Sequence, residues 1–202
     1  MTFSKGGGMN RKTFGALGLF FALILALGIQ GDVSAASLTA NIKLIVTADF
    51  TSSGDLVTSK SDLRQQYALS LASGVAGDQA DMVWSDQRTV ALSTTEDLDV
   101  DAGGLTDVFG TTFTLVKLKV LVVCAASGNT NTVDVGGDAN SVPFFAAFAD
   151  FVSVHPGGCL VLTNPALAGY AVTAGTGDII QIANGGAGTS VTYDIVIIGT
   201  SS

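Results

Sequence analysis

The chain has 202 residues, of which 48% are hydrophobic, and its formal net charge at pH 7 is −8. This length suits one ordinary domain with a substantial core. The few basic residues are scattered and outnumbered by acidic ones, which excludes the clustered basic surface of a nucleic-acid-binding protein and disfavours docking on anionic lipid.

The N-terminal segment has the pattern of an export signal. Basic residues follow Met9, an apolar run of 16 residues spans 14–29, and small residues (Val-Ser-Ala) occupy 33–35. The run is shorter than the roughly 20 residues that a membrane-spanning helix needs. The pattern therefore predicts a signal-peptide-like leader over residues 1–35 and a mature chain from Ala36. A membrane anchor that extends beyond the apolar run is the alternative.

Removal of that leader makes the protein more acidic. It takes away Lys5, Arg11, Lys12 and Asp32, which leaves six basic and sixteen acidic residues and a net charge of about −10. Such a charge favours solubility. Contact with a membrane is then expected only if the leader is retained.

After residue 37 the sequence predicts short strands separated by turns, because helix-period patterns are nearly absent and Gly, Thr, Val and Asp dominate. Residues 38–50 alternate with a period of two, and residues 51–55 then predict a break before a short strand at 67–71. The further expected elements are strands, with a single helical turn at 105–109, in the order 88–93, 96–100, 105–109, 112–125, 132–135, 144–154, 159–162, 170–173, 178–183 and 190–198.

The longest apolar stretch of the mature chain is the best core candidate. Residues 112–125 begin with alternation and pass into a continuous apolar block at 120–123, which indicates a central strand buried on both faces. Many short strands without a crossover helix predict an all-β fold over residues 36–202, an antiparallel two-sheet β-sandwich with jelly-roll-like connectivity. No repeat of fixed period is visible, which argues against a solenoid or propeller.

Three carboxylates form the sharpest metal hypothesis. Asp97, Asp99 and Asp101 stand at every second position, so on a strand they would share one face and could surround a calcium ion. Ala102 stands where a calcium loop needs Gly, and Val108 stands where it needs Glu. An acidic, solvated strand face is the favoured interpretation, so no metal site is predicted.

Histidine and cysteine are both sparse, with one histidine and two cysteines. His155 precedes a Pro-Gly-Gly signal at 156–158, which predicts a turn, and its pairing with Cys159 as base and nucleophile lacks an activating context. No catalytic residue is therefore predicted. Cys124 and Cys159 could form a disulfide in an oxidising compartment, although two buried small hydrophobic residues are the favoured interpretation.

Glycines and aromatic residues provide the last candidates. The glycine-rich segments 134–138 and 184–190 lack the lysine and the helix of a phosphate loop and predict hairpin turns or bulges, so no cofactor or small-molecule substrate is predicted. Aromatic residues could form a sugar-stacking platform, although in strands they are usually core or subunit interface. These are Trp84, Phe144, Phe145, Phe148 and Phe151.

Five segments carry a family resemblance, and they are 67–74, 77–81, 96–99, 175–178 and 191–199. They resemble segments of small β-rich proteins that are encoded among the virion structural genes of tailed phages, and the likeness covers most of residues 38–202. It implies a capsid- or tail-associated structural role, as a head decoration or fibre subunit, with self-association and contacts to other virion proteins.

Two functional classes follow. The first is a non-enzymatic, oligomeric component of a phage virion. The second is an exported bacterial surface or carbohydrate-binding β-domain, secreted or held at the cell surface if the leader acts as an export signal. Enzymatic activity is not expected, because no motif joins a nucleophile to a base.

Overall fold

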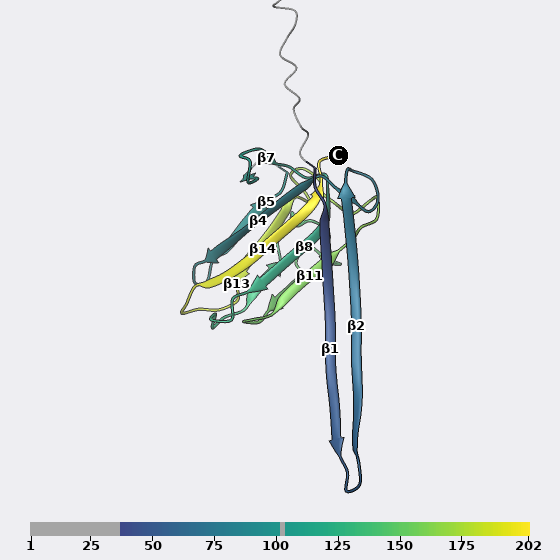
Figure 1. Cartoon of the computed structure of the whole chain (residues 1–202). Helices are drawn as coiled ribbons and strands as arrows, with labels where there is room; N and C mark the ends of the chain where they lie inside the picture. The colour runs from purple at the N-terminus through teal and green to yellow at the C-terminus, as the bar shows by residue number, and fades with distance from the viewer. Residues whose placement is uncertain (1–36, 102–103) are drawn as a thin grey trace, which may run out of the picture. The chain divides into compact units, whose positions relative to one another are not determined.

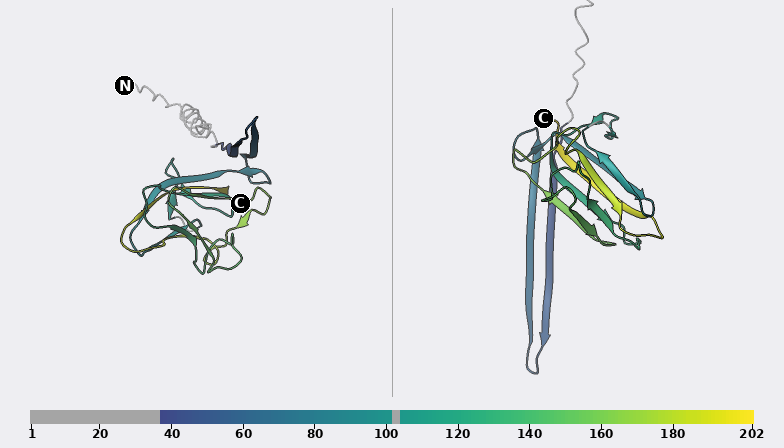
Figure 2. Two further views of the ribbon diagram at one scale, coloured as in Figure 1. Left: turned by 90° about the horizontal axis from the view of Figure 1, so that it is seen from below. Right: turned by 180° about the vertical axis from the view of Figure 1, so that it is seen from behind.

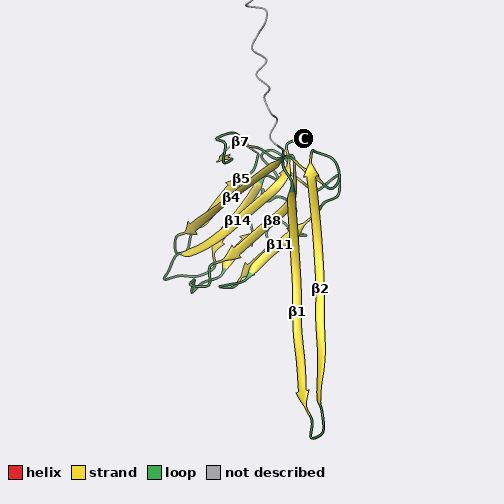
Figure 3. Ribbon diagram, in the orientation of Figure 1, coloured by secondary structure: helices red, strands yellow, loops and turns green. Residues whose placement is uncertain are grey.

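A computed structural model describes residues 37–101 and 104–202, which belong to one compact unit made of strands and connecting loops (Figure 1). Figure 3 shows no helix in these ranges. Within them, no helical segment therefore has the length and apolar character needed to cross a membrane. The predicted leader over residues 1–35 lies outside the described residues.

Two antiparallel sheets packed face to face form a β-sandwich (Figure 2). Sheet I has the strand order β11 (Cys159–Thr163), β8 (Lys117–Ala125), β14 (Val191–Thr200) and β4 (Met82–Val90), and β12 (Tyr170–Ala171) also pairs with β8. Sheet II has the order β10 (Phe151–Val154), β9 (Val133–Gly136), β13 (Ile179–Asn184) and β5 (Thr95–Asp99). The predicted all-β, antiparallel sandwich is confirmed.

The core lies between the two sheets and follows the period-two alternation of their strands. In β14, every second residue from Val191 to Ile197 is buried in this core, and in β13 the same holds for Ile180 and Ile182. The intervening residues of β14 point to the opposite face of sheet I. One face of each sheet therefore supplies the interior of the sandwich.

The predicted central strand is β8, which lies between β11 and β14. Leu121 and Val123 are 0% exposed and pack in the core between the sheets. Val120 is also 0% exposed, but it belongs to a second apolar cluster on the outer face of sheet I, where Val122 packs as well. The continuous apolar block thus reflects a strand that is covered on both faces.

A β-bulge in sheet I buries a lysine. The register of β14 against β8 shifts between Ile198 and Gly199, which leaves Lys119 as an extra residue in β8. Its ammonium group donates hydrogen bonds to the carbonyl oxygens of Ala166 and Leu167. Burial lowers the pKa of Lys119 below its ordinary value, because the charged form loses its hydration.

A long hairpin precedes the sandwich. It consists of β1 (Ala40–Ser53) and β2 (Thr58–Ser73), paired antiparallel over their full length, and Figures 1 and 2 show it extending beyond the sheets. Only the last two residues of β2 pair with another strand, β3 (Gln79–Ala80). The strand predicted at 38–50 is confirmed, whereas the break predicted at 51–55 is wrong, because β1 continues to Ser53.

Three other expectations are also corrected. The helical turn predicted at 105–109 is instead β6 (Leu105–Thr106) and a turn leading back to β7 (Thr112–Phe113), in which the Asp107 carboxylate accepts backbone hydrogen bonds. The stretch 112–125 contains two strands, β7 and β8. The strand predicted at 144–154 is present only as β10, because residues 144–150 form a loop.

The strand predicted at 88–93 is displaced. The observed strand β4 begins at Met82 and ends at Val90, so the prediction caught only its last residues. The polar run from Ser85 to Thr89 obscured the strand, since these side chains alternate without a clear apolar face. The short strand predicted at 67–71 is only the last part of β2, which begins at Thr58. The remaining strand predictions agree with the structure to within a few residues.

Candidate functional site

The hairpin has one apolar face and one polar face, because side chains alternate along each strand and pair across the ladder. At its base, Ile42 and Leu69 stand opposite each other and pack on the outer face of sheet I, against the cluster that contains Val120 and Ile198. This contact covers the sheet face that would otherwise expose a continuous apolar block. The base of the hairpin is therefore part of the folded core.

The same face stays apolar beyond the base, where nothing in the described part of the chain covers it. Its large side chains are between 42% and 74% exposed, and we call this set the apolar stripe: Leu44, Val46, Phe50, Leu63 and Tyr67. Contiguous exposed apolar patches on soluble proteins commonly mark interaction sites. The stripe is the strongest candidate for a functional surface.

The opposite face of the hairpin is mostly polar and charged, with Ile45, 52% exposed, as its one large apolar side chain within the ladder. The Lys60 ammonium lies 2.9 Å from an Asp62 carboxylate oxygen and 3.6 Å from an Asp49 carboxylate oxygen. These side chains are more than half exposed, so such pairs contribute only about 0 to 1 kcal/mol. The polar face is suited to water, whereas the apolar stripe is not.

A groove of about 340 Å³ lies where the hairpin leaves the sandwich. Leu44 and Tyr67 line it from the hairpin, and Val161, Thr163 and Pro165 line it from β11 and the loop that follows. The groove thus continues the apolar stripe to the edge of sheet I.

The three candidate calcium ligands do not form a metal site. Asp97 accepts a hydrogen bond from the Gln181 side-chain amide at 2.8 Å, and Asp99 accepts one from the backbone N–H of Asp101 at 2.9 Å. Asp99 ends β5, and Asp101 follows the strand. In residues 37–101 and 104–202, no group of three or more His, Cys, Asp or Glu residues could hold a metal ion.

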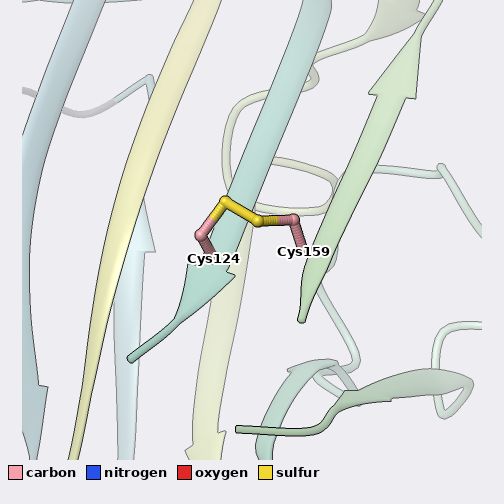
Figure 4. Close-up of a disulfide and its surroundings, with 2 residues drawn as sticks. All are labelled: Cys124 and Cys159. Carbon is pink, nitrogen blue, oxygen red and sulfur yellow. A yellow bond between two sulfur atoms is a disulfide. The ribbon is translucent and has the colours of Figure 1, made fainter. Parts of the chain in front are cut away.

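The cysteines form a disulfide, which corrects the favoured interpretation of two buried hydrophobic residues. Cys124 of β8 and Cys159 of β11 are direct cross-strand partners, and Figure 4 shows the bond between them. Cys159 is exposed and Cys124 is only partly buried. In this oxidised form no thiol is available to pair with His155, which lies exposed in the turn before β11.

The aromatic residues do not form one platform. Trp84 is 6% exposed and packs in the sandwich core, with the Arg88 guanidinium 5.9 Å from its ring centroid. Phe144 makes edge-to-face contacts with Phe145 and Tyr170 at centroid distances of 4.8 and 6.5 Å. Trp84 therefore belongs mainly to the core, although it also lines a groove that it shares with Arg88.

The glycine-rich segments lie in connections between strands. Residues 184–190 join β13 to β14, and the backbone N–H of Gly185 donates to the Thr132 carbonyl at 3.0 Å. Gly136 and Gly137, at the end of β9, have φ values of 105° and 99°, which side chains rarely adopt. Their role is to turn the chain, which agrees with the hairpin-turn or bulge prediction.

A buried polar cluster was not predicted. The Tyr193 hydroxyl, in a side chain that is 0% exposed, donates to one Glu96 oxygen at 3.0 Å, and the Arg88 Nε donates to the other at 2.7 Å. Burial raises the pKa of Tyr193 above its ordinary value, and the neighbouring Glu96 carboxylate raises it further. These groups satisfy one another, and none is poised as a base.

A second groove lies beside this cluster. It has a volume of about 340 Å³ and a mixed lining that includes Asp86, Arg88, Thr106 and Asp107. Arg88 is held there by Asp86 at 3.0 Å as well as by Glu96. The groove could accept a small polar ligand, but Arg88 is already paired with Asp86, and the Asp107 carboxylate accepts backbone hydrogen bonds.

Comparisons of the chain with protein-family models, with curated proteins and with solved structures found no match. Function is therefore inferred from the surfaces of this chain. The apolar stripe escaped prediction because residues 60–66 look like a polar turn. The signal that could have revealed it was the even spacing of Leu63 and Tyr67, which places Leu63 on the same face as the apolar residues of the strand predicted at 67–71.

Proposed function

We propose that the protein is a non-enzymatic structural component of a virion, associated with the capsid or the tail, and that it acts as a homo-oligomer. The observation that carries the proposal is the apolar stripe, which leaves five large side chains exposed on one hairpin face. A two-stranded hairpin alone is at best marginally stable in water, so this face favours a partner. The family resemblance supports the virion as the place of assembly.

The strand order supports a jelly-roll connectivity. Counted along the chain, the eight main strands of the sandwich are β4, β5, β8, β9, β10, β11, β13 and β14. Sheet I then contains the first, eighth, third and sixth strands, and sheet II contains the second, seventh, fourth and fifth. This order supports the proposal of a jelly roll built from two Greek keys, an architecture of viral capsid and lectin domains.

An exported bacterial surface or carbohydrate-binding domain is the second candidate. The disulfide between Cys124 and Cys159 favours an oxidising location outside the cytoplasm. The groove beside Arg88 offers polar groups of the kind that bind sugar hydroxyls. Capsid, portal and tail genes beside this one would support the virion proposal, whereas secretion or polysaccharide genes would support this candidate.

Self-association is the first test. The full chain is expressed, and the purified product is analysed by multi-angle light scattering at tens of micromolar. We expect a homo-oligomer, because burying the apolar stripe between copies removes apolar surface from water, which lowers the free energy. A strictly monomeric protein would contradict the proposal, and a monomer that also bound glycans on an array would support the second candidate.

The leader is tested on the same material. We expect an intact mass that corresponds to an N-terminus at Ala36 or Ser37, because small residues at 33–35 follow an apolar run too short for a spanning helix. The mass spectrum of the purified protein measures this directly. Recovery of residues 14–29 in the membrane fraction would instead support a retained anchor.

A further inference from the structure

We propose that the outer edge of β2 pairs antiparallel with the same edge of a second copy, so that the two hairpins form one continuous sheet in which Ser61 faces the partner's Ser61. This inference rests on the proposed self-association and adds to it a contact surface that is distinct from the apolar stripe. It commits to a second copy of this chain as the occupant of the edge.

The outer edge of β2 presents backbone groups that pair with nothing in the described part of the chain. β1 pairs with one side of β2, and β3 pairs with the other side only at Ala72 and Ser73. The Ala72 N–H donates to the Asp78 carbonyl at 3.0 Å, so it points away from β1. Backbone groups alternate in direction along a strand, so every second residue before Ala72 also points its N–H and C=O outward. Those farther from the base are Thr58, Lys60, Asp62, Arg64 and Gln66. Such an edge is a template for another strand.

This edge is open over the part of β2 that lies beyond the sandwich. Every residue from Thr58 to Ala68 is exposed. Figures 1 and 2 show β2 on the side of the hairpin that is farther from the sandwich. Nearer the base, the loop after β11 approaches, because Pro165 accepts a hydrogen bond from the Asp78 N–H at 2.8 Å and lines a groove together with Ala68. A second strand therefore has room between Thr58 and about Gln66.

The charges on β2 select one register within this open stretch. Lys60, Asp62 and Arg64 alternate in sign at every second position, so they share one face of the strand. Registers that place Lys60 opposite the partner's Lys60, or Asp62 opposite the partner's Asp62, bring like charges together and are destabilised. The register between them places each Lys60 opposite the partner's Asp62 and each Arg64 opposite the partner's Thr58. The next favourable register toward the base would need the edge at Ala68, and the next one toward the turn would leave Asp62 outside the paired stretch.

The charges within one hairpin favour a copy of β2 as the partner. Asp49 of β1 stands directly opposite Asp62, an arrangement in which like charges are destabilising. The Lys60 ammonium lies near both carboxylates, at 3.6 Å from Asp49 and 2.9 Å from Asp62. In the proposed sheet, the partner's Lys60 stands on the other side of Asp62, so the two carboxylates gain a second cation. Because the contact is two-fold, each copy both gives and receives this lysine. An unrelated strand would offer backbone hydrogen bonds without this reciprocal pairing.

A disulfide across the two-fold axis tests the edge and its register. In the full chain, Ser61→Cys would place two thiols on directly opposed, non-hydrogen-bonded residues, whose Cα atoms are about 4.5 Å apart and can be bridged. The native cysteines are already paired with each other. Mild oxidation should therefore give a covalent dimer on a non-reducing gel. The matched control is Ser59→Cys, on the same edge and face, which should cross-link several-fold less because the two copies of residue 59 would be roughly 14 Å apart.

A covalent dimer of Ser61→Cys in clear excess over Ser59→Cys supports the proposal. Equal cross-linking of the two variants would overturn the register. If neither variant cross-links while the wild type is an oligomer in light scattering, the edge is not the interface, although the proposed self-association stands. A monomeric wild type would contradict both the inference and the proposed function.

Two charge variants test the contact without added cysteines. Lys60→Asp and Asp62→Lys each place like charges across the proposed contact, so each variant alone should dissociate at a several-fold higher concentration than the wild type. Both side chains are more than half exposed, so the fold should be unchanged in circular dichroism. When the two variants are mixed with different affinity tags, each offers the other opposite charges at both positions, and mixed complexes should exceed those of either variant alone. Changes within one hairpin persist in the mixture, so this recovery reports contact between copies. A mixture that associates no better than the single variants would overturn the pairing.

Discussion

Replacing Leu121 with Ala should lower the free energy of unfolding by about 2 to 5 kcal/mol. Leu121 is 0% exposed in the central strand β8, where it packs in the core between the two sheets. The substitution removes buried methyl groups and leaves a cavity. Because β8 is paired with a strand on each side, it cannot easily move to fill that cavity. Urea denaturation of the purified protein, followed by circular dichroism, measures the change.

Leu92→Ala is the matched control for this substitution. Leu92 is 53% exposed and lies in the turn between β4 and β5. The same loss of side-chain atoms should therefore change stability by no more than about 0.5 kcal/mol. A denaturation midpoint for Leu121→Ala equal to that of Leu92→Ala would place residue 121 at the surface.

Loss of the disulfide should have the second large effect. The double variant Cys124→Ala, Cys159→Ala is expected to be less stable by about 2 to 4 kcal/mol, because the bond closes a long loop in the unfolded chain. The two cysteines are 35 residues apart and link neighbouring strands of sheet I. Thermal and urea unfolding of the oxidised wild type and the double variant measure the difference.

A reducing agent provides the internal control for that experiment. It should destabilise the wild type toward the level of the double variant and leave the double variant unchanged, since the two cysteines form the bond and no others exist in the chain. Equal stability of the oxidised wild type and the double variant would show that the pairing of β8 with β11 needs no covalent link.

The strands of the sandwich could be predicted because their buried and exposed residues follow a pattern that is visible in the sequence. In β14 and β13 alternate residues enter one core, which produces the period of two that sequence patterns detect. The block at 120–123 also predicted its position correctly, because only a strand covered on both faces is apolar throughout. What covers its outer face, the base of the hairpin, was not predictable.

The hairpin was only half predicted for a related reason. The first part of β2, from Thr58 to Gln66, contains charged residues on its polar side and is held by its ladder of hydrogen bonds to β1 rather than by burial. Periodic sequence patterns detect strands that bury one face within their own chain. A strand whose apolar face is left uncovered therefore resembles a loop in its sequence. The error at 105–109 is similar, since two-residue strands carry almost no periodic signal.

The contacts between side chains of different strands were less predictable still, because they join distant positions. Tyr193 and Glu96 are 97 residues apart, and only the stacking of sheet I on sheet II brings them together. A tyrosine in an otherwise apolar strand does indicate that its hydroxyl needs a partner, although not which one. The cysteines were ambiguous for the same reason, because their register across β8 and β11 is a property of the fold.

The position of β14 within sheet I has a consequence for synthesis. It pairs with both β8 and β4, so it is an inner strand of sheet I, and its partners in β4 lie about a hundred residues earlier in the chain. Such long-range pairings form slowly and late. A nascent chain that ends before Val191 leaves β4 without its partner and the core open on one side. Folding of the sandwich is therefore delayed until β14 has been synthesised.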